Sequence, residues 1–278
     1  MTIAITGASG ALGQLALTAL KARAPQAEFI ALVRDPAKIT GTPARAFDYT
    51  KPETLAPALK GIDTLVLISS NDFNNRAGQH RAVIDAAKAA DVTRIIYTSI
   101  LKGDASPMIL AADHIATEAA LKASGIPATI LRNGWYTENY TGSLKASIEH
   151  GALIGSSANG RIASAARADY AEAIAVTALD DSHAGKTYEL AGDIPHTMAE
   201  FAAEVSNQVG KAIAFNTLPK DTYAGILQSF GLPEAFANIL ADSDDTAATG
   251  SLLDESHTLS KLIGRPTTPI ATTIKAAL

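Results

Sequence analysis

The chain of 278 residues contains no cysteine. Disulfide bonds, thiolate nucleophiles, iron–sulfur clusters and cysteine-ligated zinc are therefore excluded, and the composition suits a reducing compartment. No apolar run approaches the roughly 18 residues that a membrane helix needs, so no membrane partner is expected. The first residues, Met1 to Ile5, carry no basic side chain and lead directly into a glycine turn. We therefore expect no signal peptide and a cytoplasmic location.

Concentrated positive charge is also lacking. The chain has 23 Lys and Arg residues against 28 Asp and Glu residues, for a formal net charge of -5. A nucleic-acid partner is not expected, because phosphate contacts need clustered cations. The six histidines are scattered without an H-E-x-x-H pattern, so no metal centre is predicted. The acidic run at Asp242, Asp244 and Asp245 lacks the glycine and final glutamate of a calcium loop, and is interpreted as a solvated helix end.

Short β-branched or apolar runs alternate with alanine-rich helical segments over the first 131 residues. Strands are predicted at 2–6, 29–33, 44–47, 64–68, 94–98 and 128–131, with helices at 12–22, 79–90 and 110–124. Continuous apolar strands alternating with helices are typical of a parallel sheet covered on both faces. Right-handed crossovers between such strands produce a doubly wound α/β (Rossmann) fold.

After about Gly134 this alternation loosens. Helices are predicted at 168–179, 198–209, 221–230 and 233–241, with short strands at 188–190 and 212–215. We interpret residues 1–134, with elements contributed from 168–192, as a dinucleotide-binding domain. Residues 135–278 are interpreted as a smaller, mostly helical C-terminal α/β lobe for the substrate. Such a lobe would lie at the carboxyl edge of the sheet, where open α/β folds bind ligands.

Three glycines follow the first predicted strand in the run Gly7-Ala8-Ser9-Gly10-Ala11-Leu12-Gly13. In a strand–turn–helix unit, Gly7 permits a tight turn, Gly10 allows a close approach to a pyrophosphate, and Gly13 allows close helix–strand packing. The alternative is a structural turn without a ligand. A Walker A loop is excluded because Gln14 follows Gly13, and the G-x-S-x-G pattern of a nucleophile elbow is absent here.

The residue that ends the second predicted strand indicates which dinucleotide binds. An NAD site usually has Asp or Glu there, whereas this chain has Arg34 followed by Asp35 and Pro36. A planar guanidinium suits a 2′-phosphate, which favours NADP(H). The alternative for Arg34 is an ordinary surface arginine. Asp35 is interpreted as the N-cap of a short helix that begins at Pro36.

Several segments together are similar to one family. They are ITGASGALG (5–13), ALVRDPAK (31–38), FDYTKPETLAPALKGIDTLVLISS (47–70), IIYTS (95–99), LRNGWYTENY (131–140) and LSKLIGRPTT (259–268). The chain resembles the NmrA-like branch of the atypical short-chain dehydrogenase/reductases, above all the bacterial type 2 NAD(P)H:quinone oxidoreductases, with the triphenylmethane reductases as near relatives. The resemblance runs nearly from end to end. It implies an NADPH-binding Rossmann domain, a smaller C-terminal lobe, and a quinone pocket in the cleft between them.

The resemblance also implies which residues form the site. The cofactor contacts it implies are Gly7, Ala8, Ser9, Gly10, Ala11, Leu12, Arg34, Ser69, Ser70, Asn71, Asn133, Gly134, Trp135, Tyr136, Thr137 and Glu138. The candidates for the substrate pocket are Phe73, Trp135, Tyr136 and Asn139. The alternatives are loop polarity for the two serines and core packing for the aromatic residues.

The acid of ordinary short-chain dehydrogenases is missing, because no Y-x-x-x-K pattern stands at the expected place. The comparable pair is His114 and Glu118, where His114 is a candidate proton donor and a simple electrostatic contact is the alternative. A quinone accepts a hydride without a strong acid, so the leading hypothesis is direct hydride transfer from NADPH to a quinone. Another conjugated acceptor, such as a triarylmethane dye or an imine, and a non-catalytic redox sensor remain alternatives. No oligomeric state follows from the sequence.

Overall fold

The computed structural model describes all 278 residues, and the chain forms two compact units. The first unit comprises Met1–Gly103, Asp113–Asn133 and Arg167–Tyr188. The second comprises Asp104–Ala112, Gly134–Ala166 and Glu189–Leu278. None of the helices has the length and apolar character that a membrane span requires.

A seven-stranded sheet forms the centre of the first unit, in the order β3-β2-β1-β4-β5-β6-β8. Its strands are β1 (Thr2–Thr6), β2 (Glu28–Val33), β3 (Ala44–Ala46), β4 (Thr64–Leu67), β5 (Arg94–Ile100), β6 (Ala128–Asn133) and β8 (Thr187–Leu190). Pairing from β3 through β6 is parallel, so the predicted doubly wound sheet is confirmed. The strand order reverses between β1 and β4, where a doubly wound sheet leaves a crevice at its carboxyl edge.

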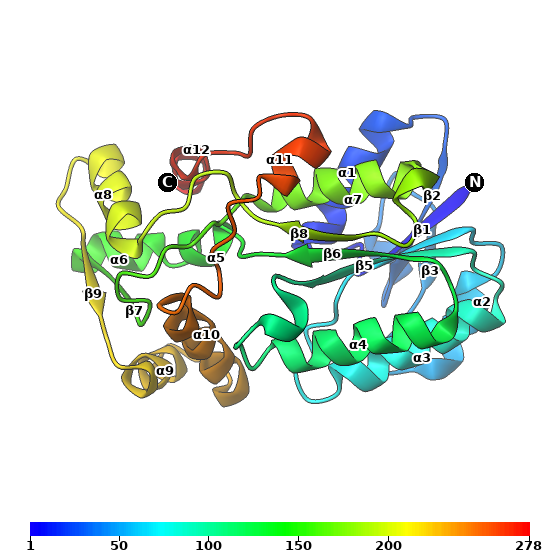
Figure 1. Cartoon of the computed structure of the whole chain (residues 1–278), viewed down its shortest axis with the longest axis horizontal. Coiled ribbons are helices and arrows are strands. Elements are labelled where there is room, and N and C mark those ends of the chain that lie inside the picture. The colour runs from blue at the N-terminus through cyan, green and yellow to red at the C-terminus, as the bar shows by residue number, and fades with distance from the viewer. The chain divides into compact units, whose positions relative to one another are not determined.

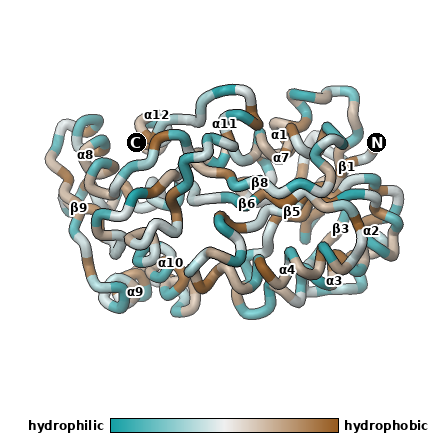
Figure 2. The backbone as a smooth tube through the Cα atoms, in the orientation of Figure 1, coloured by the Kyte–Doolittle hydropathy of each residue, from teal (hydrophilic) through white to brown (hydrophobic).

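Helices cover both faces of this sheet (Figure 1). Helices α1 (Ala11–Arg23) and α7 (Arg167–Leu179) lie on one face, and α2 (Leu55–Leu59), α3 (Arg76–Ala89) and α4 (Ala111–Ser124) lie on the other. In helix α1, the apolar side chains of Leu12, Ala16 and Leu20 are buried. Every residue of β4 and β5 is buried as well, and Figure 2 shows brown, hydrophobic segments near the label of β5. Burying one such Leu or Ile side chain contributes roughly 1.5–3 kcal/mol.

The second unit contains a two-stranded parallel sheet of β7 (Ala152–Gly155) and β9 (Ala214–Thr217). Its helices are α5 (Glu138–Thr141), α6 (Leu144–His150), α8 (Met198–Val209), α9 (Lys220–Ser229), α10 (Glu234–Ala247), α11 (Thr258–Ile263) and α12 (Ile270–Ala277). Short 3₁₀ helices span Pro36–Lys38, Pro52–Thr54, Gly103–Ala105 and Asp181–His183. Helix α8 has the predicted bounds, and a capping box between Thr197 and Glu200 explains its sharp start.

The acidic run in the second unit does not form a solvated helix end, and that prediction was wrong for two of its three residues. Helix α10 continues to Ala247, and the exposed fractions of Asp242 and Asp244 are 4% and 6%. The Asp242 carboxylate accepts the N–H of Ile109 at 2.8 Å, while Asp244 accepts the N–H groups of Ser156 and Ser157. The carboxylates point inward because they satisfy backbone donors that would otherwise be buried without partners.

Asp244 gives a prediction about pH. Burial raises its pKa from 3.8 to about 6, against the lowering effect of the two backbone hydrogen bonds. Because the folded state binds this proton more tightly than the unfolded state, the contribution of Asp244 to the free energy of unfolding falls as pH rises from about 4 to 6. Asp244→Asn keeps the acceptor oxygen but carries no charge. We expect the free energy of unfolding of this variant, relative to that of the wild type, to increase by roughly 1–3 kcal/mol as the pH rises from 4 to 7.5. Urea unfolding at both pH values measures this change.

The matched control for this prediction is Asp245→Asn, which neutralises the exposed neighbour on the same helix. We expect the free energy of unfolding of this control to differ little from that of the wild type at both pH values. A difference between Asp244→Asn and wild type that stays constant with pH would contradict the raised pKa of Asp244.

Candidate functional site

A cavity of about 620 Å³ lies at the carboxyl edge of the sheet in the first unit. Five parts of the chain form most of its wall: the glycine turn, the end of β2, the segment after β3, the loop after β4, and the start of α7. The lining residues are Gly7, Ser9–Gly13, Leu32–Arg34, Phe47–Thr50, Ile68–Asp72, Gln79 and Arg167. All of them belong to the first unit. The cavity therefore occupies the crevice at the β1/β4 switch point.

The glycine turn has the geometry that its spacing predicts. Gly7 has a φ of 58°, which side chains rarely tolerate, and its carbonyl oxygen accepts the N–H of Gly10 at 2.9 Å. A Cβ atom on Gly13 would lie 2.3 Å from the Gly7 oxygen and 2.7 Å from Cα of Ala8. Gly7 therefore allows the turn, and Gly13 lets helix α1 begin in close contact with it.

The start of α1 offers backbone donors to the cavity. The N-cap, Gly10, provides no side-chain hydrogen bond, and the first turn contains no acidic residue. The first N–H groups of a helix have no carbonyl partner in a preceding turn, and they carry a partial positive charge. We call the glycine turn and the start of α1 the cradle. The cradle fits the pyrophosphate of a dinucleotide, since an anion would accept hydrogen bonds from the free N–H groups and would balance their partial positive charge.

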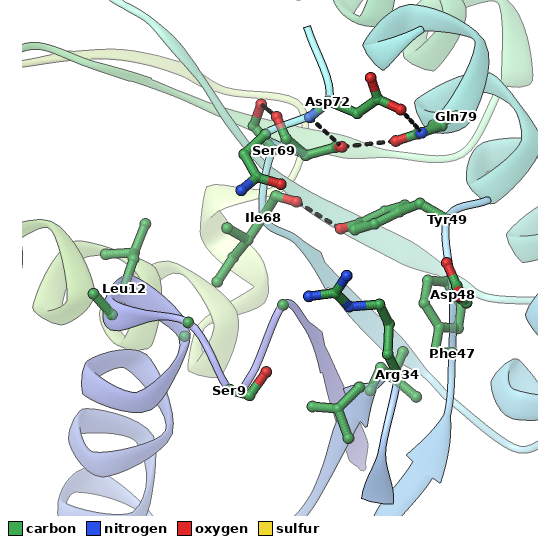
Figure 3. A pocket seen from close by; sticks show the side chains of 18 of the residues that line it. Ser9, Leu12, Arg34, Phe47, Asp48, Tyr49, Ile68, Ser69, Asp72 and Gln79 are labelled. Atoms are coloured by element: carbon green, nitrogen blue, oxygen red, sulfur yellow. Dashed lines mark hydrogen bonds between the residues drawn. The ribbon is translucent and has the colours of Figure 1, made fainter. Parts of the chain in front are cut away.

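Arg34 directly follows β2 and is exposed. Figure 3 shows its guanidinium projecting between the glycine turn and the segment that holds Asp48 and Tyr49. It forms no hydrogen bond or ion pair within the protein, so its planar set of donors is available to a ligand. Asp35 accepts the N–H of Ala37 at 3.2 Å and caps the short helix that begins at Pro36, as predicted.

Asp48 lines the same cavity, but its carboxylate already accepts hydrogen bonds from a residue of the same turn. Its Oδ1 atom accepts the N–H and the hydroxyl of Thr50, at 3.0 and 2.8 Å. Burial acts to raise the pKa of Asp48, yet the bonds from Thr50 together with the charges of Lys51 and Arg34 outweigh it and lower that pKa. The carboxylate thus stays ionised near the guanidinium without forming an ion pair with it.

The loop after β4 is held from both sides. On one side, the Tyr49 hydroxyl donates to the carbonyl oxygen of Ile68 at 2.6 Å (Figure 3). On the other side, the N–H of Ser69 donates to the Thr98 hydroxyl at 2.9 Å. Ser69, Ser70 and Asn71 therefore border the cavity from a fixed backbone. Their predicted contact with a cofactor stays a prediction.

The other predicted site residues lie elsewhere in the fold. Ala8 is fully buried within the turn and does not line the cavity, while Asn133 is the last residue of β6. The ring of Phe73 lies 4.7 Å from the guanidinium carbon of Arg76. The predicted roles of these three residues remain untested by the geometry.

The segment from Gly134 to Asn139 belongs to the second unit. The N–H of Gly134 donates to the Leu190 oxygen at 2.7 Å, and the Trp135 oxygen accepts the N–H of Ala165 at 3.1 Å. Tyr136 forms a bridge with Ala165, and the hydroxyl groups of Thr137 and Ser164 lie 2.9 Å apart. Glu138 and Asn139 begin helix α5. Hydrogen bonds inside the unit thus fix the backbone of this segment, and its contact with cofactor or substrate stays a prediction.

The reasoning from sequence named only part of the cavity wall, and Asp48, Tyr49, Gln79 and Arg167 are among the polar residues that it missed. Asp48 and Tyr49 follow β3, so the parallel pairing of β3 with β2 offered a signal for them. Gln79 lies within α3, and Arg167 is the first residue of α7, far along the chain. No local pattern marks these last two residues.

The candidate proton donor, His114, is buried in the first unit. Its Nδ1 atom lies 2.8 Å from the Tyr97 hydroxyl oxygen, and burial lowers the pKa of the imidazole well below its usual value. Glu118, four residues later, pairs with Arg132 at 2.7 Å and accepts the Ser99 hydroxyl at 2.6 Å. The ring is therefore neutral, and its part in catalysis stays a prediction. No group of three or more acidic or histidine side chains is placed to hold a metal ion.

Comparison with known proteins gives consistent matches over nearly the whole chain. A family model described as NAD(P)H-binding matches residues 7–181. Quinone oxidoreductase 2 of Escherichia coli (strain K12) is 49% identical over 277 residues, which cover 98% of this chain and 97% of that protein.

Solved structures agree with these matches. The NADPH-dependent quinone oxidoreductase QOR2 from Escherichia coli, complexed with NADPH, has a TM-score of 0.94 at 48% identity and covers 99% of each chain. The triphenylmethane reductase of Citrobacter sp., complexed with NADP(H), has a TM-score of 0.93 at 36% identity, covering 99% of this chain and 100% of that one. The resemblance found in the sequence is thereby confirmed.

Proposed function

Because this chain belongs to the NAD(P)H-binding family, we propose that it is an NADPH-dependent quinone reductase. One observation carries the choice of cofactor: Arg34, with no partner in the protein, faces a glycine turn and a helix N-terminus across one cavity. That arrangement suits a dinucleotide with an additional phosphate. The choice of a quinone rests on the relative that is 49% identical and carries that activity in its name.

The residues of the cavity divide into groups that suit different parts of NADPH. The glycine turn and the start of α1 would hold the pyrophosphate, and Arg34 would hold the 2′-phosphate. The loop from Ser69 to Asn71 would border the half of the cofactor that carries the nicotinamide. When bound, NADPH supplies the hydride for the reaction. The chain contributes binding, orientation and the exclusion of water.

A quinone is also a suitable substrate because its reduction needs no strong proton donor, and the buried tyrosines of this chain are poor donors. Burial raises the pKa of Tyr49 and of Tyr97, which makes both hydroxyl groups poor proton donors. We propose water as the proton source for the reduced quinone oxygen, because the predicted donor His114 is neutral and has no readily released proton. We propose Phe73, Trp135, Tyr136 and Asn139 as the residues that contact the quinone. A cytoplasmic location is proposed on the absence of cysteine.

One specific observation favours a second candidate function. The Citrobacter sp. triphenylmethane reductase is 36% identical and matches 99% of this chain. A conjugated dye is an activated hydride acceptor like a quinone, so a triarylmethane substrate is the alternative. A redox sensor that binds NADPH without turnover is the third possibility, and it differs from both in lacking any acceptor.

A single assay separates these functions. The oxidation of NADPH and of NADH is followed by absorbance with no acceptor, with a simple benzoquinone, and with a triarylmethane dye. We expect benzoquinone to accelerate NADPH oxidation in proportion to protein concentration, with NADH the poorer donor by roughly 10-fold or more. Acceleration by the dye alone would favour the second function. NADPH binding without acceleration by any acceptor would sink the enzyme hypothesis in favour of the sensor.

A further inference from the structure

The polar atoms of Ser70, which borders the cavity, are all hydrogen-bonded to other residues of the protein. Its N–H donates to Nε2 of His80 at 2.9 Å, and its carbonyl oxygen accepts Nε of Arg76 at 2.7 Å. Its hydroxyl donates to Gln79 at 2.7 Å and accepts the N–H of Asp72 at 3.1 Å. Ser70 is 8% exposed. The serine is therefore saturated by the protein itself, although it lies in the wall of the cofactor cavity.

Three side chains on one face of α3 make these contacts. Arg76, Gln79 and His80 are spaced at i, i+3 and i+4, which brings them together on the first turns of the helix. All three are buried, and His80 is 0% exposed. Gln79 also donates to the Asp72 carboxylate at 2.6 Å (Figure 3). The helix thus holds the loop from Ser69 to Asp72 at both its backbone and its side chains.

The hydrogen-bond directions leave His80 only one protonation state. A backbone N–H can only donate, so Nε2 of His80 carries no proton and Nδ1 must carry it. Nδ1 lies 2.9 Å from the Thr117 hydroxyl, whose own proton goes to the carbonyl oxygen of Asp113 at 2.7 Å. Burial, together with the charge of Arg76, lowers the pKa of His80 to about 3. The imidazole is therefore a fixed, neutral acceptor aimed at the Ser70 amide.

We propose that His80 is a positioning residue for the cofactor: through Nε2 it fixes the Ser70 amide and so sets the course of the loop from Ser69 to Asp72 in the wall of the NADPH cavity. The proposal rests on the function proposed above. It assigns Ser70 a role different from the predicted direct contact, because the donors of Ser70 are already used by the protein. Ser69 and Asn71, on either side of it, are then the residues that face the ligand.

A matched pair of variants tests the proposal. In His80→Gln the side-chain amide oxygen reaches about as far as Nε2 and can still accept the Ser70 N–H. In His80→Asn the shorter side chain is equally neutral and polar, but its amide reaches only as far as Nδ1. We expect His80→Asn to raise the Kd and the KM for NADPH by roughly 10-fold, because a buried amide loses its partner and the loop shifts. His80→Gln should stay within about twofold of the wild type.

The readouts distinguish positioning from general stability. The Kd for NADPH is measured by calorimetry well below the melting temperature of each variant, alongside kcat and the KM for benzoquinone. A merely structural role would lower the melting temperature and leave the Kd of the folded protein unchanged, and that result would overturn the proposal. Equal weakening of NADPH binding by both variants would overturn it too. Neither Kd depends on turnover, so a wild type that binds NADPH but reduces no quinone would refute only the proposed function.

One further measurement uses the wild-type chain, so its result does not depend on whether a variant folds. Nitrogen-15 NMR of the wild-type chain reports which ring nitrogen of each histidine carries the proton. We expect His80 to show a protonated Nδ1 and an unprotonated Nε2 near neutral pH, with and without NADPH. A proton on Nε2 would exclude the bond from Ser70 and overturn the proposal.

Discussion

Replacing Arg34 with alanine is expected to raise the KM for NADPH by roughly 10- to 100-fold while the KM for NADH changes by about twofold or less. The two cofactors differ by the 2′-phosphate alone, so an interaction with that phosphate appears as the difference between the two effects. Arg34 projects into the cavity and has no other partner to lose. Its removal therefore leaves no buried group unpaired, and the measured loss reports on the ligand. Steady-state kinetics with each cofactor at saturating benzoquinone gives both constants.

The matched control for Arg34 is Lys38→Ala. Lys38 lies four residues away, is 78% exposed at its side chain, and pairs with Asp35 at 3.7 Å. The substitution Lys38→Ala removes one positive charge, as Arg34→Ala does, but Lys38 does not line the cavity. We expect this variant to change neither KM by more than about twofold. Equal effects of Arg34→Ala on NADPH and NADH would remove Arg34 from phosphate recognition. Arg34→Lys should be intermediate, because a lysine keeps the charge but loses the fork.

The elements predicted most accurately are those whose determinants lie close together in the chain. The turn at Gly7, the start of α1 and the arginine after β2 all follow from a strand–turn–helix pattern within about one βαβ unit. The parallel sheet follows from the repetition of that pattern, since right-handed crossovers leave few alternatives. Local sequence therefore predicted the glycine turn and Arg34 that line one end of the cavity.

Determinants that lie far apart escaped prediction. Arg167 reaches the cavity wall from a helix that begins more than a hundred residues after the glycine turn. Asp244 appeared to be a solvated acid because its partners, the amides of Ser156 and Ser157, come from a separate segment of the chain. The role of His80 depends on which atom faces Ser70, and a sequence contains no such information. In these cases contacts between distant parts of the chain determine where a polar side chain lies and what it binds, and the polarity of the local sequence does not.

The second unit was predicted less completely for a related reason. Strand β7 has four residues, ALIG, and helix α5 has four, so neither is long enough to establish a period. Helix α8 was predicted within its observed bounds because it has twelve residues, a capping box and a glycine stop at Gly210. Length and terminal signals, more than composition, separated the predictable elements from the others.

Gly13→Ala is expected to abolish measurable NADPH binding, with a loss of at least roughly 100-fold in affinity and a loss of stability of 1–3 kcal/mol or more. The added Cβ would lie 2.3 Å from the Gly7 oxygen and 2.7 Å from Cα of Ala8. Both are backbone atoms, so no side-chain rotation relieves the contact, and α1 must move away from the turn. That movement would open the glycine turn and the start of α1, whose backbone donors we propose hold the pyrophosphate. Calorimetry with NADPH, after circular dichroism has confirmed folding, measures the effect.

Two other glycines calibrate this result. A Cβ on Gly10 would lie 3.2 Å from the Gly7 oxygen, so Gly10→Ala should weaken NADPH binding less than Gly13→Ala does. A Cβ on Gly225, within α9, meets nothing within 4 Å, and Gly225→Ala should raise stability by up to about 1 kcal/mol with no change in NADPH affinity. Normal NADPH binding by folded Gly13→Ala would show that α1 can shift without disturbing the cradle. The close approach at Gly13 would then be a feature of helix packing alone.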